Sequence, residues 1–208
     1  MLKFFMQIEE NINMDELINL IKFKVDLGID CFTDKIDLKN NLREQNFKNI
    51  NELENFLFEY FENNNLNFVR SEGNTNAKIL LIGNKLNDPE IMEKRPYGGK
   101  NKILLEKMLN SINVNINDVF LLNIDNFVHS RFDFFDVLFK YLNFLEPLFI
   151  INMSSREIVK FLSLHMTNSI FSINVPDPSL LIQEPTLKRI AWDNLKLLKS
   201  KLIIPDNK

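Results

Sequence analysis

Cysteine is almost absent from this sequence, since Cys31 is the only one in 208 residues. One thiol excludes a disulfide within the chain and any metal site built from several cysteines of this chain. Two interpretations of Cys31 stay open, a reactive thiol and an ordinary small residue in a loop. The scarcity of cysteine fits a reducing cytoplasm. We expect no metal and no cofactor.

Long apolar stretches are missing as well. The opening residues MLKFFMQIEENIN are apolar only briefly before acids interrupt them, so we expect no signal peptide. No window approaches the run of about 18 apolar residues that a membrane span needs. The net charge of -3 gives no general attraction to DNA, and nucleic-acid binding would need a local basic patch. We expect a cytoplasmic monomer without membrane contact.

The N-terminal part of the chain predicts helices. Asn13 and Glu16 resemble a capping box, apolar residues then recur at helical spacing, and Gly28 marks a stop. After a polar linker, Asn51 and Glu54 predict the start of a second helix. Its apolar stripe is typical of a packing face rather than a base-stacking platform; the stripe comprises Leu53, Phe56, Leu57, Tyr60 and Phe61. We assign residues 1–65 to an N-terminal helical extension.

Strands and helices alternate through residues 66–208, which we assign to one domain. Four short apolar runs predict strands: Ile79–Ile82 ending on Gly83, Val119–Asn123, Phe149–Ile151 and Ile170–Val175. Helical spacing follows each run: one helix begins near Lys100, a second has inward residues between Phe134 and Leu145, a third is capped by Ser154 with Glu157, and the last starts from about Pro185. This alternation predicts an α/β fold with three α/β/α layers around a short, mostly parallel four-stranded sheet.

The segment from Ala77 to Leu109 is where we expect the functional site. It predicts a buried strand, a polar loop and a helix, and ligands of parallel sheets bind beyond the carboxyl ends of such strands. Asn123 ends the next strand, and its amide offers a donor and an acceptor together, which suits recognition of a base edge. An incidental asparagine is the alternative, because the whole sequence is rich in Asn.

Two motifs in this order resemble a known family. Arg95-Pro96-Tyr97-Gly98-Gly99 precedes a Leu-Leu helix, and Leu187-Lys188-Arg189-Ile190-Ala191-Trp192-Asp193-Asn194-Leu195 begins the last helix. Together they resemble the iron–sulfur (family 4) uracil-DNA glycosylases of alphaproteobacteria. The resemblance implies extrusion of a deoxyuridine from DNA and cleavage of its N-glycosidic bond, as in base excision repair. The chain lacks the cysteines that ligate the family's cluster, so we expect no cluster.

The resemblance also implies site residues. Catalytic positions fall on Asn84 and Asp177, where the family has an acid and a histidine, so both are substituted here. Substrate-binding positions fall on Gly83, Tyr97 and Asn123. DNA-binding positions fall on Ser179, Leu180, Leu181, Lys188 and Arg189.

The two substitutions leave three functional hypotheses. In the first, the chain is a working glycosylase with weakened chemistry, in which Asp177 or Asp88 handles the water. The second is a catalytically inactive module that keeps the pocket and binds nucleic acid, and the third is a partner-binding scaffold. An ionised Asp177 near the departing uracil would oppose its negative charge by about 4 kcal/mol at 4 Å and an effective dielectric near 20. His129 is a catalytic candidate or a surface histidine, and His165 is expected to be structural.

Overall fold

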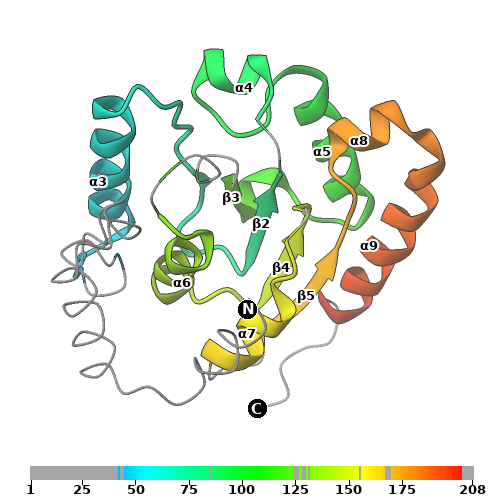
Figure 1. The fold of residues 1–208 in the computed structure, drawn as a ribbon. Helices are drawn as coiled ribbons and strands as arrows, with labels where there is room; N and C mark the ends of the chain where they lie inside the picture. Colours follow the sequence, from blue (N-terminus) through cyan, green and yellow to red (C-terminus); the bar gives the residue numbers. More distant parts are fainter. Residues whose placement is uncertain are drawn as a thin grey trace, which may run out of the picture. The chain divides into compact units, whose positions relative to one another are not determined.

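The computed structural model describes residues 42, 45–84, 86–123, 127, 130, 132–154, 156–166 and 170–202. The chain divides into two units, 1–41 and 42–208, and every described residue lies in the second. The predicted Asn13 helix and Cys31 lie outside the described residues. The helices are α3 (Ile50–Asn63), α4 (Asp88–Glu93), α5 (Gly99–Ser111), α6 (Phe134–Leu145), α7 (Val159–His165), α8 (Pro178–Gln183) and α9 (Lys188–Leu202), with 3-10 turns η2 (Ile116–Asp118) and η4 (Pro185–Leu187) (Figure 1). None of them is long and apolar enough to cross a membrane.

The central sheet has five strands in the order β1-β3-β2-β4-β5. The four predicted strands are β2 (Ile79–Gly83), β3 (Val119–Asn123), β4 (Phe149–Asn152) and β5 (Phe171–Asn174), and they are parallel. The two-residue β1 (Glu72–Gly73) pairs antiparallel with β3. The predicted α/β class and mostly parallel sheet are therefore confirmed. The edge strand β1 was not predicted, because two residues show no periodicity.

One face of the sheet is covered by α3, α6 and α7 (Figure 1). Leu80 and Ile82 of β2 point to this side, since alternate residues of a strand face opposite layers. Aromatic rings fill much of the interface, and Phe61 packs against Phe68 with ring centroids 5.0 Å apart. The buried stripe of α3 belongs to the same cluster, so its predicted role as a packing face is confirmed. Each fully buried side chain of this size contributes about 1.5–3 kcal/mol.

The other face of the sheet is covered by α5, α8 and α9 (Figure 1). Ile79 and Leu81 of β2 point to it, and the cluster is mainly aliphatic. Leu105 of α5 and Leu198 of α9 are fully buried there. The sheet is thus enclosed by two helical layers, and the ends of its strands are the places left for polar chemistry.

Several helix boundaries differ from the sequence-based expectation. Helix α3 begins after Asn49, whose side chain accepts a hydrogen bond from the Glu52 amide, and the predicted cap at Asn51 with Glu54 is wrong. Helix α7 has no side-chain cap, because Ser154 instead hydrogen-bonds the Asn152 side chain. Helices α4 and α8 were not predicted, since six residues are too few to display a clear helical period.

Candidate functional site at the carboxyl edge of the sheet

Asparagines end three of the parallel strands. Asn123 ends β3 opposite Gly83 of β2, and Asn152 of β4 lies opposite Asn174 of β5. Pairing in register brings these positions to one edge although they are distant in sequence. The structure therefore gathers Gly83 and Asn123, two of the predicted substrate-binding residues, at the edge where ligands of parallel sheets bind.

A depression of about 650 Å³ opens at this edge, over the ends of β4 and β5. Asn84 and Asp177, the two positions matched to catalytic residues, both line it. The other lining residues are neutral: Asn152, Met153, Ser154, Asn174, Val175, Pro176, Ser179, Leu180, Gln183, Leu187, Ile190 and Asn194. Its volume is that of a small-molecule site, and its walls mix amides with aliphatic side chains.

Asp177 is both the N-cap residue of α8 and a lining residue of the depression. Its Oδ1 accepts hydrogen bonds from the Ser179 amide at 2.9 Å and the Ser179 hydroxyl at 2.6 Å, which caps α8. Its Oδ2 accepts a hydrogen bond from the Tyr97 hydroxyl at 3.2 Å. Only 6% of the residue is exposed. The carboxylate is thus fixed in orientation by three donors from two separate segments.

Tyr97 lies buried beneath the depression and does not line it. A Cβ built on Gly83 would lie 3.0 Å from the Tyr97 hydroxyl oxygen and 3.3 Å from the Asn123 amide nitrogen, so all three residues meet. Asn123 is buried as well. The three predicted substrate-binding residues are brought together, but none of them lines the depression.

The backbone of Tyr97 is held in an unusual conformation. Its φ of 58° lies in the left-handed region, which costs a bulky residue about 1–2 kcal/mol. The Tyr97 amide donates to Glu90 Oε1 at 2.6 Å, and Glu90 Oε2 accepts from the Asn87 amide at 2.8 Å. Glu90 is buried at the centre of this loop. It therefore holds the turn that places the Tyr97 ring, a role that the sequence did not reveal.

The environment of the Tyr97 hydroxyl is electrostatically negative. Burial is the main cause that raises the pKa of Tyr97 well above its ordinary value, and the carboxylates of Asp177 and Glu90 raise it further. The hydroxyl accordingly remains protonated and serves as a donor to Asp177. No base or acid function at neutral pH follows for this tyrosine.

A polar network supports the β4 side of the depression. Asn152 Nδ2 donates to the Arg156 carbonyl oxygen at 2.9 Å and to Asn174 Oδ1 at 2.8 Å. Its Oδ1 accepts from the Ser154 hydroxyl at 2.6 Å, and Asn194 of α9 donates to the Asn174 carbonyl oxygen at 2.7 Å. Sequence reasoning missed this network. The only signal was that both strands end in Asn.

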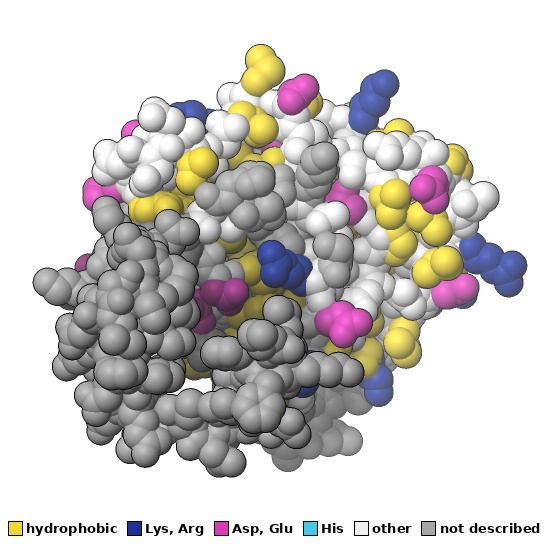
Figure 2. Space-filling view, in the orientation of Figure 1, with side chains coloured by type: hydrophobic (Ala, Val, Ile, Leu, Met, Phe, Trp, Pro, Cys, Tyr) yellow, Lys and Arg dark blue, Asp and Glu magenta, His cyan; other side chains and the backbone are white. Residues whose placement is uncertain are grey.

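The predicted DNA-binding residues lie on α8 and α9 but differ in exposure. Lys188 and Arg189 are exposed at the start of α9, and Leu180 is partly exposed. Leu181 is buried against the aliphatic core and presents no side chain to a partner, while the Ser179 hydroxyl is engaged with Asp177. Figure 2 shows hydrophobic side chains at the surface over α8 and α9; those exposed there are Leu180, Ile182, Ile190, Trp192 and Leu197.

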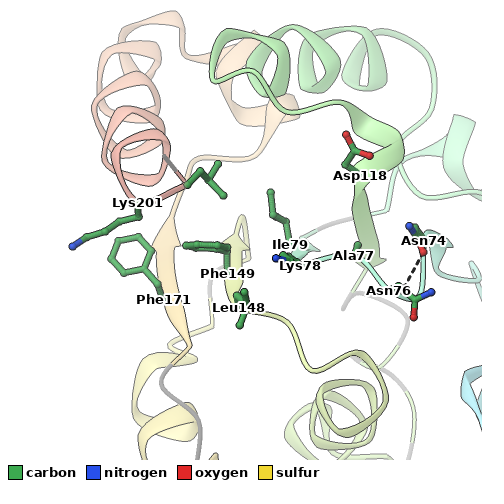
Figure 3. Close-up of a pocket in the computed structure, with 11 residues that line it drawn as sticks. Asn74, Asn76, Ala77, Lys78, Ile79, Asp118, Leu148, Phe149, Phe171 and Lys201 are labelled. Atoms are coloured by element: carbon green, nitrogen blue, oxygen red, sulfur yellow. Dashed lines mark hydrogen bonds between the residues drawn. The ribbon is translucent and has the colours of Figure 1, made fainter. Parts of the chain in front are cut away.

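A second depression, of about 640 Å³, lies at the opposite edge, where β2, β4 and β5 begin. Figure 3 shows Phe149 and Phe171 side by side there, with Lys78 and Asp118 on the neighbouring segments. The Lys78 carbonyl accepts from the backbone amides of Leu148 and Phe149, which joins the starts of β2 and β4, and the Asn76 amide donates to Asn74 Oδ1 at 2.9 Å. We place the candidate site at the carboxyl edge, where the predicted residues converge.

Of the two histidines, the structure describes only His165. The His165 ring stacks on Phe161 with centroids 4.5 Å apart, and its Nδ1 lies 3.1 Å from the Phe161 carbonyl oxygen, as expected for a structural role. His129 lies outside the described residues.

No protein-family model matches this sequence, and a search of curated proteins finds no match either. Function is therefore inferred from the residues themselves.

Proposed function

We propose that this chain is a uracil-DNA glycosylase-like protein that binds a flipped base at the carboxyl edge of its sheet and cleaves the N-glycosidic bond only weakly. The observation that supports it is the convergence of Gly83, Asn84, Tyr97, Asn123 and Asp177 at one edge. These residues were selected by motif order in a sequence where they span almost a hundred positions. Their convergence is what a shared site requires.

Weak chemistry follows from the groups present. Asn84 can orient a water through its amide oxygen but cannot accept a proton. The Asp177 carboxylate supplies no donor to a departing uracil anion. Loss of a general base lowers a rate about a hundred- to ten-thousandfold, and loss of an oxyanion donor about a hundred- to a thousandfold.

A catalytically inactive binding module is the second candidate, and one observation favours it. Tyr97 and Asn123 are buried and do not line the depression, and both Asp177 oxygens already accept hydrogen bonds. A site so fixed is better suited to holding a ligand than to exchanging protons with one. Binding of uracil-containing DNA without release of free uracil would select this candidate.

The test is release of uracil from a single-stranded uracil oligonucleotide. The wild type is expected to be far slower than an ordinary glycosylase. The double variant Asn84→Glu with Asp177→His is expected to be faster than the wild type and faster than either single variant. Asn110→Glu with Asp118→His makes the same exchanges at exposed positions on other elements and is expected to change nothing. A wild type as fast as ordinary glycosylases would contradict the weakened chemistry.

The proposed partner is DNA, contacted by a cytoplasmic monomer through Lys188 and Arg189. Arg95 of the Arg-Pro-Tyr-Gly-Gly motif is basic as well, but it already donates to the Glu72 carboxylate, with its Nε 3.0 Å from Glu72 Oε2. Two phosphate contacts predict modest affinity that falls with salt as roughly the 0.7–0.9 power per contact. Lys188→Gln with Arg189→Gln should reduce that salt dependence, whereas Lys107→Gln with Lys160→Gln, two exposed lysines on α5 and α7, should not.

A further inference from the structure

The charge of the depression is the feature that separates it from a site for an anionic leaving group. Among the described residues that line it, Asp177 is the only one with a formal charge. The remaining polar groups are amides and hydroxyls, and the walls between them are aliphatic. A ligand placed here lies beside one negatively charged side chain, and none of the described lining residues is positively charged.

Two carboxylates, those of Asp177 and Glu90, contact Tyr97 next to the depression. The Tyr97 hydroxyl lies within hydrogen-bond distance of Asp177 Oδ2 and of Met153 Sδ, so its proton is already engaged within the protein. The buried Glu90 carboxylate accepts a hydrogen bond from the Tyr97 amide. Burial is the main cause of the raised pKa of Tyr97, and the two carboxylates raise it further.

The charge of a base differs between the lesions that a glycosylase removes. Uracil leaves a neutral nucleoside as an anion, and a carboxylate beside it opposes that change. A guanine methylated at N7 is already cationic in the nucleoside. Its C1′–N9 bond breaks with the electron pair moving to the base, which leaves neutral. Water then adds its oxygen to C1′ and releases one proton.

We propose that the preferred substrate class of this site is a cationic N-alkylated purine, bound with its charge against Asp177. The carboxylate attracts the cationic base before cleavage. As the C1′–N9 bond breaks, the positive charge moves to the sugar, and the carboxylate attracts it there. No general acid is needed for the leaving group, and apart from Asp177, which acts here as a carboxylate, the described lining residues have no acidic side chain. The volume of about 650 Å³ is sufficient for a purine. The inference rests on the proposed glycosylase-like function.

The experiment uses the full chain and three single-stranded oligonucleotides that differ at one position: 7-methylguanine, guanine or uracil. Release of free base is measured by chromatography at slightly acidic pH, where the methylated guanine keeps its positive charge, and spontaneous release is subtracted. We expect 7-methylguanine to be released at least tenfold faster than uracil. Guanine, which matches it in shape apart from the methyl group, should not be released.

The variants separate charge from folding. Asp177→Asn keeps a side chain that caps helices well and should lower the ratio of 7-methylguanine release to uracil release at least tenfold. Asp133→Asn makes the same exchange at the cap of α6, where Asp133 accepts from the Phe135 amide at 2.8 Å, and should behave as the wild type. Asp177→Glu keeps the charge and should retain the preference. Circular dichroism and thermal unfolding confirm that each variant is folded.

The outcomes distinguish the two proposals. Uracil released faster than 7-methylguanine would overturn this inference and leave the glycosylase-like function standing. An unchanged ratio of the two rates in folded Asp177→Asn would also overturn it. Release and binding of neither modified base would overturn both proposals. A preference for 7-methylguanine that disappears in Asp177→Asn supports the assignment.

Discussion

Two carboxylates in this protein have nearly the same hydrogen-bond partners in very different places. Glu54 of α3 accepts from the Ser71 amide at 2.8 Å, from the Ser71 hydroxyl and from the Tyr141 hydroxyl at 2.8 Å. Asp177 accepts from the amide and hydroxyl of Ser179 and from the Tyr97 hydroxyl. Each group combines one serine with one buried tyrosine. Neither carboxylate is more than 6% exposed.

The surroundings of the two carboxylates differ. Glu54 lies between α3 and α6, and Arg70 Nη1 is 3.9 Å from its Oε2. All three of its donors converge on a single oxygen, Oε1. Asp177 divides its donors between both oxygens and borders an open depression. The same set of partners therefore fixes a carboxylate inside the core in one place and at the border of an open depression in the other.

The strongest way to break the first group is Glu54→Ala. It leaves the buried Tyr141 hydroxyl and the part-buried Ser71 donors without their acceptor, and each buried donor without a partner costs about 1–3 kcal/mol. We expect the free energy of unfolding to fall by about 4 kcal/mol in urea titrations. Glu59→Ala, an exposed position on the same helix, should change it by less than about 0.5 kcal/mol. A loss below about 1 kcal/mol for Glu54→Ala would mean that water replaces the carboxylate.

The support beneath the second group is tested by Glu90→Ala. This change removes the acceptor of the Tyr97 and Asn87 amides and with it the contact that opposes the strain of the left-handed Tyr97 backbone. We expect a loss of about 3 kcal/mol in the free energy of unfolding. The matched control is Glu93→Ala, an exposed residue of the same helix, with little expected effect. Equal stability of the two variants would contradict a positioning role for Glu90.

The difference between the two groups also shows what sequence pattern conveys. The strands β2 and β3 were predicted to the residue at their carboxyl ends, because apolar runs of four residues followed by Gly83 or Asn123 are strong local signals. Register then follows from burial on both faces, and it brings those ends together. The edge that holds the site was predictable for this reason.

The partners of the carboxylates were not predictable in the same way. Glu54 looked like a capping residue of α3, and only the tertiary structure shows that Ser71 and Tyr141 take up its oxygen. The burial of Tyr97 depends on Glu90, seven residues earlier in a helix too short to predict. Such contacts depend on where loops close, and single-sequence spacing contains no measure of that.

Alkaline pH tests the two buried tyrosines together. The pKa of Tyr97 and Tyr141 is raised well above its ordinary value, first by burial and then by the neighbouring carboxylates. Unfolded tyrosine ionises near pH 10, whereas the folded state keeps both protons, so stability is fully present below about pH 10 and falls as the pH rises further. We expect a decline of about 1.4 kcal/mol per pH unit for each tyrosine. Urea unfolding between about pH 9 and pH 11 should show a shallower decline in Tyr141→Phe, by the share of one tyrosine. An identical decline in this variant would show that Tyr141 ionises normally in the folded state.

The smallest expected effect on stability, and the sharpest comparison, comes from neutralising each carboxylate without shortening it. In Glu54→Gln the amide oxygen replaces Oε1, but the NH₂ group then faces the Arg70 guanidinium, and we expect a loss of about 2 kcal/mol. In Asp177→Asn the oxygen still caps α8, and the NH₂ group meets the Tyr97 hydroxyl, which can rotate to accept. The expected loss is therefore below about 1 kcal/mol. Thermal and urea unfolding of both variants measure the contrast. If Asp177→Asn were the more destabilising of the two, Asp177 would be a structural carboxylate like Glu54, and its place at the depression would no longer distinguish it.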